Sequence, residues 1–128
     1  MACALAVLTP SSAFASSSRN INLYSTDGGA RLVGTLTWVS AHQWTFSGTL
    51  ADVKCDGRTP EVTFLTNPAR SDAHVSGTIQ NRNGCNKATV AVQKGWTLSG
   101  TLYSVVLEVG NATSSWSYRN DVTYSIPY

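Results

Sequence analysis

Residues 55–61, with the sequence CDGRTPE, are the segment of this chain whose residue types most clearly suggest a chemical role. Arg58 lies between Cys55, where a disulfide would hold one end of the loop, and Pro60, whose ring fixes the backbone φ angle. A trypsin-like protease would accept an arginine here, and a preordered loop loses little conformational entropy when it binds a protease. Arg58 and Thr59 are therefore candidate contacts of an inhibitory loop. The alternative is an ordinary Asp-Gly turn tied down by a structural disulfide.

Catalysis would need a nucleophile with a base, a pair of carboxylates or a metal cluster. His42 and His74 are isolated, and no serine lies in a GxSxG motif. Asp52, Asp56 and Glu61 could bind calcium, but their loop lacks the DxDxDG spacing. We therefore predict that the protein is not an enzyme and holds no metal or other cofactor, although two distant carboxylates could still meet as a glycosidase pair. The acids of the chain are mostly turn residues and are interpreted as solvated turn caps: Asp27, Asp52, Asp56, Glu61, Asp72, Glu108 and Asp121.

The first residues of the chain have features of a secretory signal peptide. A short apolar run at residues 2–8 is broken by Pro10, and AFA at residues 13–15 matches a signal-peptidase site, so we expect residues 1–15 to be removed. The run lacks the usual Lys or Arg before it, and it is too short to anchor the protein in a bilayer. A buried N-terminal helix is the alternative. The sequence thus predicts a secreted, extracellular protein with no membrane span.

The cysteines support an oxidising environment. The chain has three cysteines, and removal of the signal peptide would take away Cys3 and leave Cys55 and Cys85 as a pair. A disulfide between them would stabilise the domain by about 3–4 kcal/mol on the chain-entropy model. A metal site is the alternative, but there is no CxxC motif and the histidines are isolated.

The composition indicates one folded domain rich in strands and turns. Hydrophobic residues make up 42% of the chain and charged residues 12%, which excludes a disordered protein. A length of 128 residues suits a single domain with a real core. The net charge is only +2 and the basic residues are scattered, so no nucleic-acid partner is indicated.

Polar clusters that contain Gly, Asn, Asp and Pro divide the chain at short intervals. The runs between them alternate between apolar and polar residues, so that Leu36 and Trp38 share one face of a run, as do Val62 and Phe64. No window shows a convincing helical period. We predict an all-β fold, either an antiparallel β-sandwich or a small barrel, with about eight or nine short strands.

One seven-residue segment occurs twice, as WTFSGTL at residues 44–50 and as WTLSGTL at residues 96–102. Each copy follows a run that is typical of a strand and a short turn, with SAHQ before the first copy and VQKG before the second. Gly48 and Gly100 lie where a strand would bend. After each copy the apolar positions shift from even to odd numbers, which indicates a β-bulge or a crossing between sheets. We interpret the repeat as a duplicated hairpin module rather than as a ligand-binding motif.

The tryptophans could form a sugar-binding platform, because exposed aromatic rings stack on sugars. All of them lie on the apolar phase of their predicted strands, so we predict that they belong to the core. Tyr103 and Tyr128 are candidate exposed aromatic residues. Asn111 begins a glycosylation sequon, which would matter only in a eukaryotic host. The tryptophans are Trp38, Trp44, Trp96 and Trp116.

The start of the secreted protein, residues 16–26, is predicted to be either an edge strand or an arm that leaves the domain, and residues 27–128 to form the single β domain. An extended arm offers a row of backbone donors and acceptors to another protein. Its arginine could hold a carboxylate bidentately, and its apolar side chains could enter pockets of the partner. The candidate partner-binding residues of this arm are Arg19, Ile21, Leu23 and Tyr24.

The AFA signal end, the polar arm, the repeated WTxSGTL strands and the single cysteine pair resemble the small secreted β-proteins of Streptomyces-type actinobacteria. Some of those are similar in plan to the small linking subunit of umbrella toxin particles, a non-enzymatic adaptor that joins a lectin- or protease-like subunit to a large toxin subunit. The resemblance implies that this protein is an adaptor for other secreted proteins in an antibacterial toxin complex. Serine-protease inhibition through Arg58 and carbohydrate binding are the alternative functions.

Overall fold

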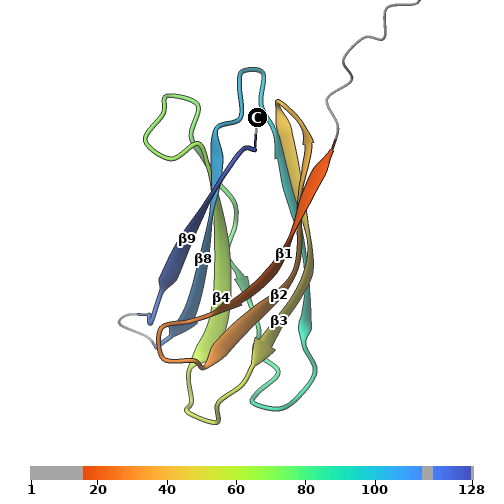
Figure 1. The fold of residues 1–128 in the computed structure, drawn as a ribbon. Coiled ribbons are helices and arrows are strands. Elements are labelled where there is room, and N and C mark those ends of the chain that lie inside the picture. The colour runs from red at the N-terminus through yellow and green to blue at the C-terminus, as the bar shows by residue number, and fades with distance from the viewer. Residues whose placement is uncertain (1–15, 114–116, 128) are drawn as a thin grey trace, which may run out of the picture.

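The computed structural model describes residues 16–113 and 117–127 of the chain (Figure 1). The predicted signal peptide at residues 1–15 lies outside the described residues, as do Trp116 and Tyr128. Within the described ranges, no helix is long and apolar enough to cross a membrane.

In this part of the chain, nine strands form two antiparallel sheets that pack face to face (Figure 1). The four-stranded sheet has the order β1-β2-β3-β7, and the five-stranded sheet has the order β5-β4-β8-β9, with β6 also paired to β4. The predicted all-β sandwich is confirmed. The four-stranded sheet contains β1 (Ser17–Tyr24), β2 (Ala30–Ser40), β3 (Gln43–Asp52) and β7 (Val90–Thr97). The five-stranded sheet contains β4 (Thr59–Thr66), β5 (His74–Val75), β6 (Ile79–Gln80), β8 (Ser104–Ala112) and β9 (Asn120–Ser125).

The alternation of apolar and polar residues places the core between the two sheets. In β3, Trp44, Phe46 and Leu50 are buried, and most of the residues between them are more exposed. Phe64 of β4 reaches across from the other sheet, with its ring centre 5.4 Å from that of Trp44 and 5.2 Å from that of Phe46. Trp44 Nε1 donates a hydrogen bond of 2.8 Å to Thr66 Oγ1. The buried indole is therefore both packed and hydrogen-bonded.

The first copy of the repeated segment forms the predicted hairpin, but the second copy does not. β2 and β3 pair as a hairpin, and the whole of WTFSGTL lies in β3. In the second copy, β7 runs without a turn through VQKG and ends at Thr97, so residues 98–103 form a loop. The prediction of a duplicated hairpin module is wrong, because VQKG lies inside β7 and makes no turn, so the second copy has no preceding strand to pair with as a hairpin.

The chain crosses between the sheets after each copy, from β3 to β4 and from β7 to β8, as the shift in apolar phase indicates. The set of buried positions, however, changes only after the second copy. Leu102 is fully buried at an even position and Val105 is fully buried at an odd one, and the chain crosses between the sheets at this point. After the first copy, Val53 and Cys55 are exposed, and β4 again buries even positions such as Val62. The odd-numbered apolar residues there belong to a surface loop rather than to a strand.

Trp38 and Trp44 are buried as predicted, but Trp96 is not a core residue. It is 39% exposed, because β7 is an edge strand and its inward side chains reach the rim between the sheets. There Trp96 stacks on His74 of β5, with ring centres 3.4 Å apart and planes within 3° of parallel. His74 in turn pairs with Thr66 of β4. Trp44, Thr66, His74 and Trp96 thus form a chain of contacts that joins the two sheets along this rim.

The equivalent glycines of the two repeat copies should respond differently to alanine. A Cβ at Gly48 would overlap the carbonyl oxygen of Val33 and lie 2.7 Å from Cα of Gly34. We expect Gly48→Ala to lower the free energy of unfolding by about 3 kcal/mol, because the two backbones would have to separate. A Cβ at Gly100 would have Asp72 Oδ2, at 3.5 Å, as its closest neighbour, so Gly100→Ala should change stability by less than about 0.5 kcal/mol. Urea denaturation measures both variants, and equal losses would contradict this account of the repeat.

Candidate functional site

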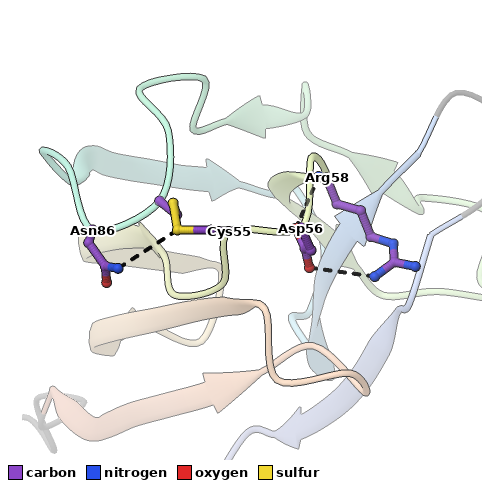
Figure 2. The surroundings of a disulfide bond; sticks show 5 residues. Cys55, Asp56, Arg58 and Asn86 are labelled. Carbon is purple, nitrogen blue, oxygen red and sulfur yellow. Dashed lines mark hydrogen bonds and ion pairs between the residues drawn. A yellow bond between two sulfur atoms is a disulfide. The ribbon is translucent and has the colours of Figure 1, made fainter.

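The loops at one end of the sandwich, the lower end in Figure 1, converge on a disulfide. Residues 25–29 join β1 to β2, residues 53–58 join β3 to β4, and residues 81–89 lead from β6 to β7. Cys55 is bonded to Cys85, with the two Cα atoms 5.0 Å apart, as the sequence predicts. The disulfide therefore ties the second of these loops to the third (Figure 2).

Asn86 connects the same two loops beside the disulfide (Figure 2). Its backbone N–H donates a hydrogen bond of 3.1 Å to the carbonyl oxygen of Asp52, and its side-chain nitrogen lies 3.9 Å from Cys55 Sγ. Its φ angle is 55°, in the left-handed region that asparagine tolerates better than most residues. The third loop is thus held by a covalent bond and by a backbone hydrogen bond.

Arg58, the predicted protease contact, is bound to its own domain. Its Nη1 lies 3.6 Å from Asp27 Oδ2 and 3.5 Å from Asp56 Oδ2, and Figure 2 shows the guanidinium turned toward Asp56. Its Cζ lies 4.6 Å from the centre of the Tyr118 ring. A protease would have to break these contacts before it could hold the side chain. Thr59, the other predicted contact, is half-buried as the first residue of β4.

Asn111, near the end of β8, links the acids of this region. It is fully buried, and its Nδ2 donates hydrogen bonds of 3.0 Å to Asp27 Oδ2 and 2.9 Å to Asp56 Oδ2. A Cβ at Gly29 would overlap this amide nitrogen, so the glycine provides the space that the asparagine occupies. The sequon asparagine therefore lies inside the folded domain, where a glycosylating enzyme has no access to it.

Asp27 is stabilised in its ionised form. Burial by itself would raise the pKa of Asp27, but hydrogen bonds from Ser25, Asn111 and the amide of Gly29, together with the positive charge of Arg58, outweigh burial and lower this pKa. The cluster thus carries its own cation in Arg58. Among the residues that the structure describes, no group of three or more His, Cys, Asp or Glu side chains could hold a metal ion.

Asp52 is the residue of this region that the sequence interpretation missed. It is only 9% exposed, and its Oδ1 has no hydrogen-bond partner among the described residues. Burial raises the pKa of Asp52, the amide of Lys54 opposes that shift and the charge of Asp56 adds to it. Its interpretation as a solvated turn residue is wrong. A signal was present in the sequence, because Asp52 continues the even-numbered series of buried residues in β3 that ends with Leu50.

A pocket of about 560 Å³ lies beside the disulfide. Two of its lining atoms, Asp52 Oδ1 and Arg58 Nε, are buried without a hydrogen-bond partner in the described structure, and Asn111 Oδ1 in the adjoining cluster is a third. Such groups cost stability and are uncommon in folded proteins. Their concentration makes this pocket the candidate functional site. The lining residues are Asp52, Lys54, Cys55, Asp56, Gly57, Arg58, Thr59, Asn81, Arg82, Gly84 and Cys85.

The predicted partner-binding residues near the N-terminus lie along β1, an edge strand of the sheet. Ile21 is 2% exposed and belongs to the core, and Leu23 packs against that core. Arg19 is exposed, and its Cζ lies 5.9 Å from the centre of the Tyr124 ring in β9. Tyr24 is 42% exposed. In the free protein, two of these four residues therefore serve the sandwich itself, and two remain at its surface.

The two histidines bind separately at the opposite end of the sandwich and do not form a pair. His42 Nδ1 lies 2.5 Å from the carbonyl oxygen of Gly100, to which its N–H donates, whereas His74 stacks on Trp96. Tyr103 is 43% exposed, as predicted, and Arg70 lies over its ring. These contacts hold the upper loops together.

In comparisons with protein-family models, curated proteins and solved structures, none matched this chain. The resemblance to toxin adaptors stays a prediction.

Replacement of Asp52 by asparagine should stabilise the protein at neutral pH. Because the folded-state pKa is raised, ionisation of Asp52 costs stability as the pH rises above its ordinary value of 3.8. We expect Asp52→Asn to raise the free energy of unfolding by about 1–2 kcal/mol at neutral pH, and this gain to disappear below pH 3.8. Urea denaturation at several pH values tests this, with Asp121→Asn as an exposed control that should have little effect. A destabilised Asp52→Asn at neutral pH would overturn the assignment of an unpartnered carboxylate.

Proposed function

We propose that this protein is a secreted, non-enzymatic adaptor that binds another secreted protein along β1. The observation that carries the proposal is that β1 is an eight-residue edge strand, paired with β2 over its whole length and with no other strand in the described part of the chain. An edge strand of this length offers free backbone donors and acceptors to an extended segment of a partner. The binding mode would add one strand to the four-stranded sheet.

The other edges of the sandwich are less suited to this role. β5 and β6 have two residues each. β9 carries Asp121 in an ion pair with Arg119, and the tryptophan of β7 is already stacked on His74 of the other sheet. Charges on an edge strand discourage pairing. The outward row of β1 is uncharged and consists of Ser18, Asn20, Asn22 and Tyr24, and the one charged residue of the strand, Arg19, lies on the inward phase.

The outer face of the four-stranded sheet extends this surface. Its side chains are mainly those of Ser, Thr, Asn and Gln, and Arg31 is the one charged residue on this face among the described residues. Arg31 Nε donates a hydrogen bond of 3.0 Å to Asn22 Oδ1, and its Cζ lies 5.5 Å from the centre of the Tyr24 ring. Val33 beside them is 38% exposed. Because tyrosine and arginine are enriched at protein interfaces, this corner is the expected anchor of the partner.

A hollow on the same face offers a second point of attachment. It has a volume of about 600 Å³ and lies over β3 and β7. Gly95, which has no side chain, pairs with Thr45 here, and an apolar side chain of the partner would fill the space above the glycine. The lining residues are Thr45, Phe46, Ser47, Gln93, Lys94 and Gly95.

The compartment and the partner are the finer parts of the proposal. A disulfide is compatible with a secreted protein, and the predicted signal peptide would direct export. The resemblance to linking subunits of umbrella toxin particles implies that the partner is another subunit of such a complex. The alternatives have weaker support, because Arg58 is held in ion pairs and one face of Trp96 is covered by His74.

The Arg58 loop should not inhibit trypsin. We expect the wild-type protein to leave trypsin activity unchanged in a steady-state assay, because Arg58 is held by Asp27 and Asp56. Arg58→Ala should instead lower the free energy of unfolding by about 1–2 kcal/mol, since it leaves both carboxylates without their cation. Inhibition by the wild type that Arg58→Ala abolishes would favour the inhibitor function over the adaptor.

A photo-crosslinking amino acid at position 20 should capture the partner. Asn20 is exposed on β1 and Thr123 is exposed on β9, so the same amino acid at position 123 provides the matched control. In culture fluid of the producing organism, we expect a specific protein adduct, identified by mass spectrometry, from position 20 alone.

The affinity of lysine variants for the purified partner then tests directly whether β1 is the interface. Asn20→Lys should weaken binding by about tenfold or more, because a lysine on the edge opposes strand addition, whereas Thr123→Lys should leave binding unchanged. Adducts from position 123 alone, or equal losses from both lysine variants, would show that β1 is not the interface.

A further inference from the structure

The pocket at the lower end holds charges that the rest of the described structure does not neutralise. Five of its lining residues are charged. Asp56 is paired with Arg58, with Oδ2 and Nη1 3.5 Å apart, and Arg58 also pairs with Asp27, which does not line the pocket. The remaining three, Asp52, Lys54 and Arg82, form no ion pair in the described part of the chain. One carboxylate and two cations are therefore left facing one space.

The carboxylate of Asp52 is the buried group among these three charges. Asp52 is 9% exposed, and its Oδ1 has no hydrogen-bond partner among the residues that the structure describes. A buried carboxylate in this state is unfavourable unless a donor, best of all a cation, comes to it. Neither Lys54 nor Arg82 donates to this carboxylate. Lys54 Nζ donates to the backbone carbonyl of Asp27, and Arg82 donates to Gln80.

The two cations that line this pocket, Lys54 and Arg82, are each held by hydrogen bonds. Arg82 Nε and Nη2 donate to Gln80 Oε1 over 3.0 Å and 2.7 Å, which leaves its Nη1 for a ligand. Arg58 Nε, buried without a partner, adds one more donor on the wall. An anionic group would be held well by these donors, but a purely anionic ligand would leave Asp52 unpartnered, and a purely cationic ligand would be repelled by Lys54 and Arg82.

We propose that this pocket binds a small zwitterion, an α-amino acid or a short peptide, with its ammonium group on Asp52 and its carboxylate on Lys54 and Arg82. The volume of about 560 Å³ lies in the range of small-molecule sites. A neutral sugar could bond to Asp52 through a hydroxyl group, but it would leave both cations uncompensated. The zwitterion is the class of ligand that meets every unpaired charge of the pocket.

The walls of the pocket are rigid enough to select such a ligand. Asn81 is 1% exposed, and its Nδ2 donates to the carbonyl oxygens of Leu50 at 2.9 Å and Ala88 at 3.3 Å. Together with the disulfide, these bonds hold the loop that carries Arg82 against the end of β3. A preformed site loses little entropy on binding. This inference is independent of the β1 interface, because it concerns another surface and is tested with small molecules.

Calorimetric titration with L-alanyl-L-alanine tests the proposal. N-acetyl-alanyl-alanine removes the ammonium charge and alanyl-alanine amide removes the carboxylate, so each should bind about tenfold more weakly or worse. Free L-alanine keeps both charges and should also bind. Equal binding of the dipeptide and its two analogues, tighter binding of glucose than of the dipeptide, or no binding of dipeptide and L-alanine to the folded protein would each overturn the proposal.

Three variants locate the site. Asp52→Asn should weaken the binding of L-alanyl-L-alanine about tenfold while the protein stays folded. It should leave the weak binding of N-acetyl-alanyl-alanine unchanged. Arg82→Gln, at an exposed side chain, should weaken the binding of the dipeptide but not the binding of alanyl-alanine amide. Arg70→Gln, at an exposed arginine that lies over Tyr103 at the opposite end of the sandwich, is the control and should change neither affinity. Unchanged dipeptide affinity in Asp52→Asn would place any binding elsewhere and exclude this site.

Discussion

The contact of Phe64 with Trp44 and Phe46 is the interaction on which the rest of this structure depends. It is the aromatic centre of the interface between the two sheets, and both Trp44 and Phe64 are almost completely buried. The hydrogen bond from Trp44 to Thr66 fixes the indole and places Thr66 beside His74. β3 and β4 both extend from this centre to the lower end of the sandwich. Their packing therefore also positions Asp52, the last residue of β3, and Arg58, which directly precedes β4.

The lower end combines groups that stabilise the fold with groups that oppose it. The disulfide between Cys55 and Cys85 restricts the unfolded chain and holds two loops together, and Arg58 forms ion pairs with both Asp27 and Asp56. Next to them stands a buried carboxylate with an unpartnered oxygen. A domain that needed only stability would be better served by an asparagine at that position. The loss of stability caused by this carboxylate indicates a ligand site, since residues that oppose folding concentrate where function requires them.

The repeated segment shows how tertiary context overrides local sequence. WTFSGTL continues as a central strand, because β3 has partners on both sides. WTLSGTL begins in an edge strand and leaves it after Thr97. The same glycine is therefore locked between two backbones in one copy and lies in a loop in the other. The six letters that the two copies share give them the same local preference for extended structure, and the neighbouring strands decide whether that preference is realised.

Much of the architecture could be predicted from the sequence by itself, because it follows from local periodicity and composition. The alternation in β3 and β8, the polar turns and the single pair of cysteines that would remain after signal cleavage led to an antiparallel sandwich with one disulfide. The even-numbered position of Asp52 also carried a signal of burial. What the sequence did not determine is non-local. Asn111 meets Asp27 across 84 residues of chain, and Trp96 is at a rim because strand order, not residue type, makes β7 an edge. Contacts of this kind depend on which strands become neighbours, and only the packing of the two sheets decides that.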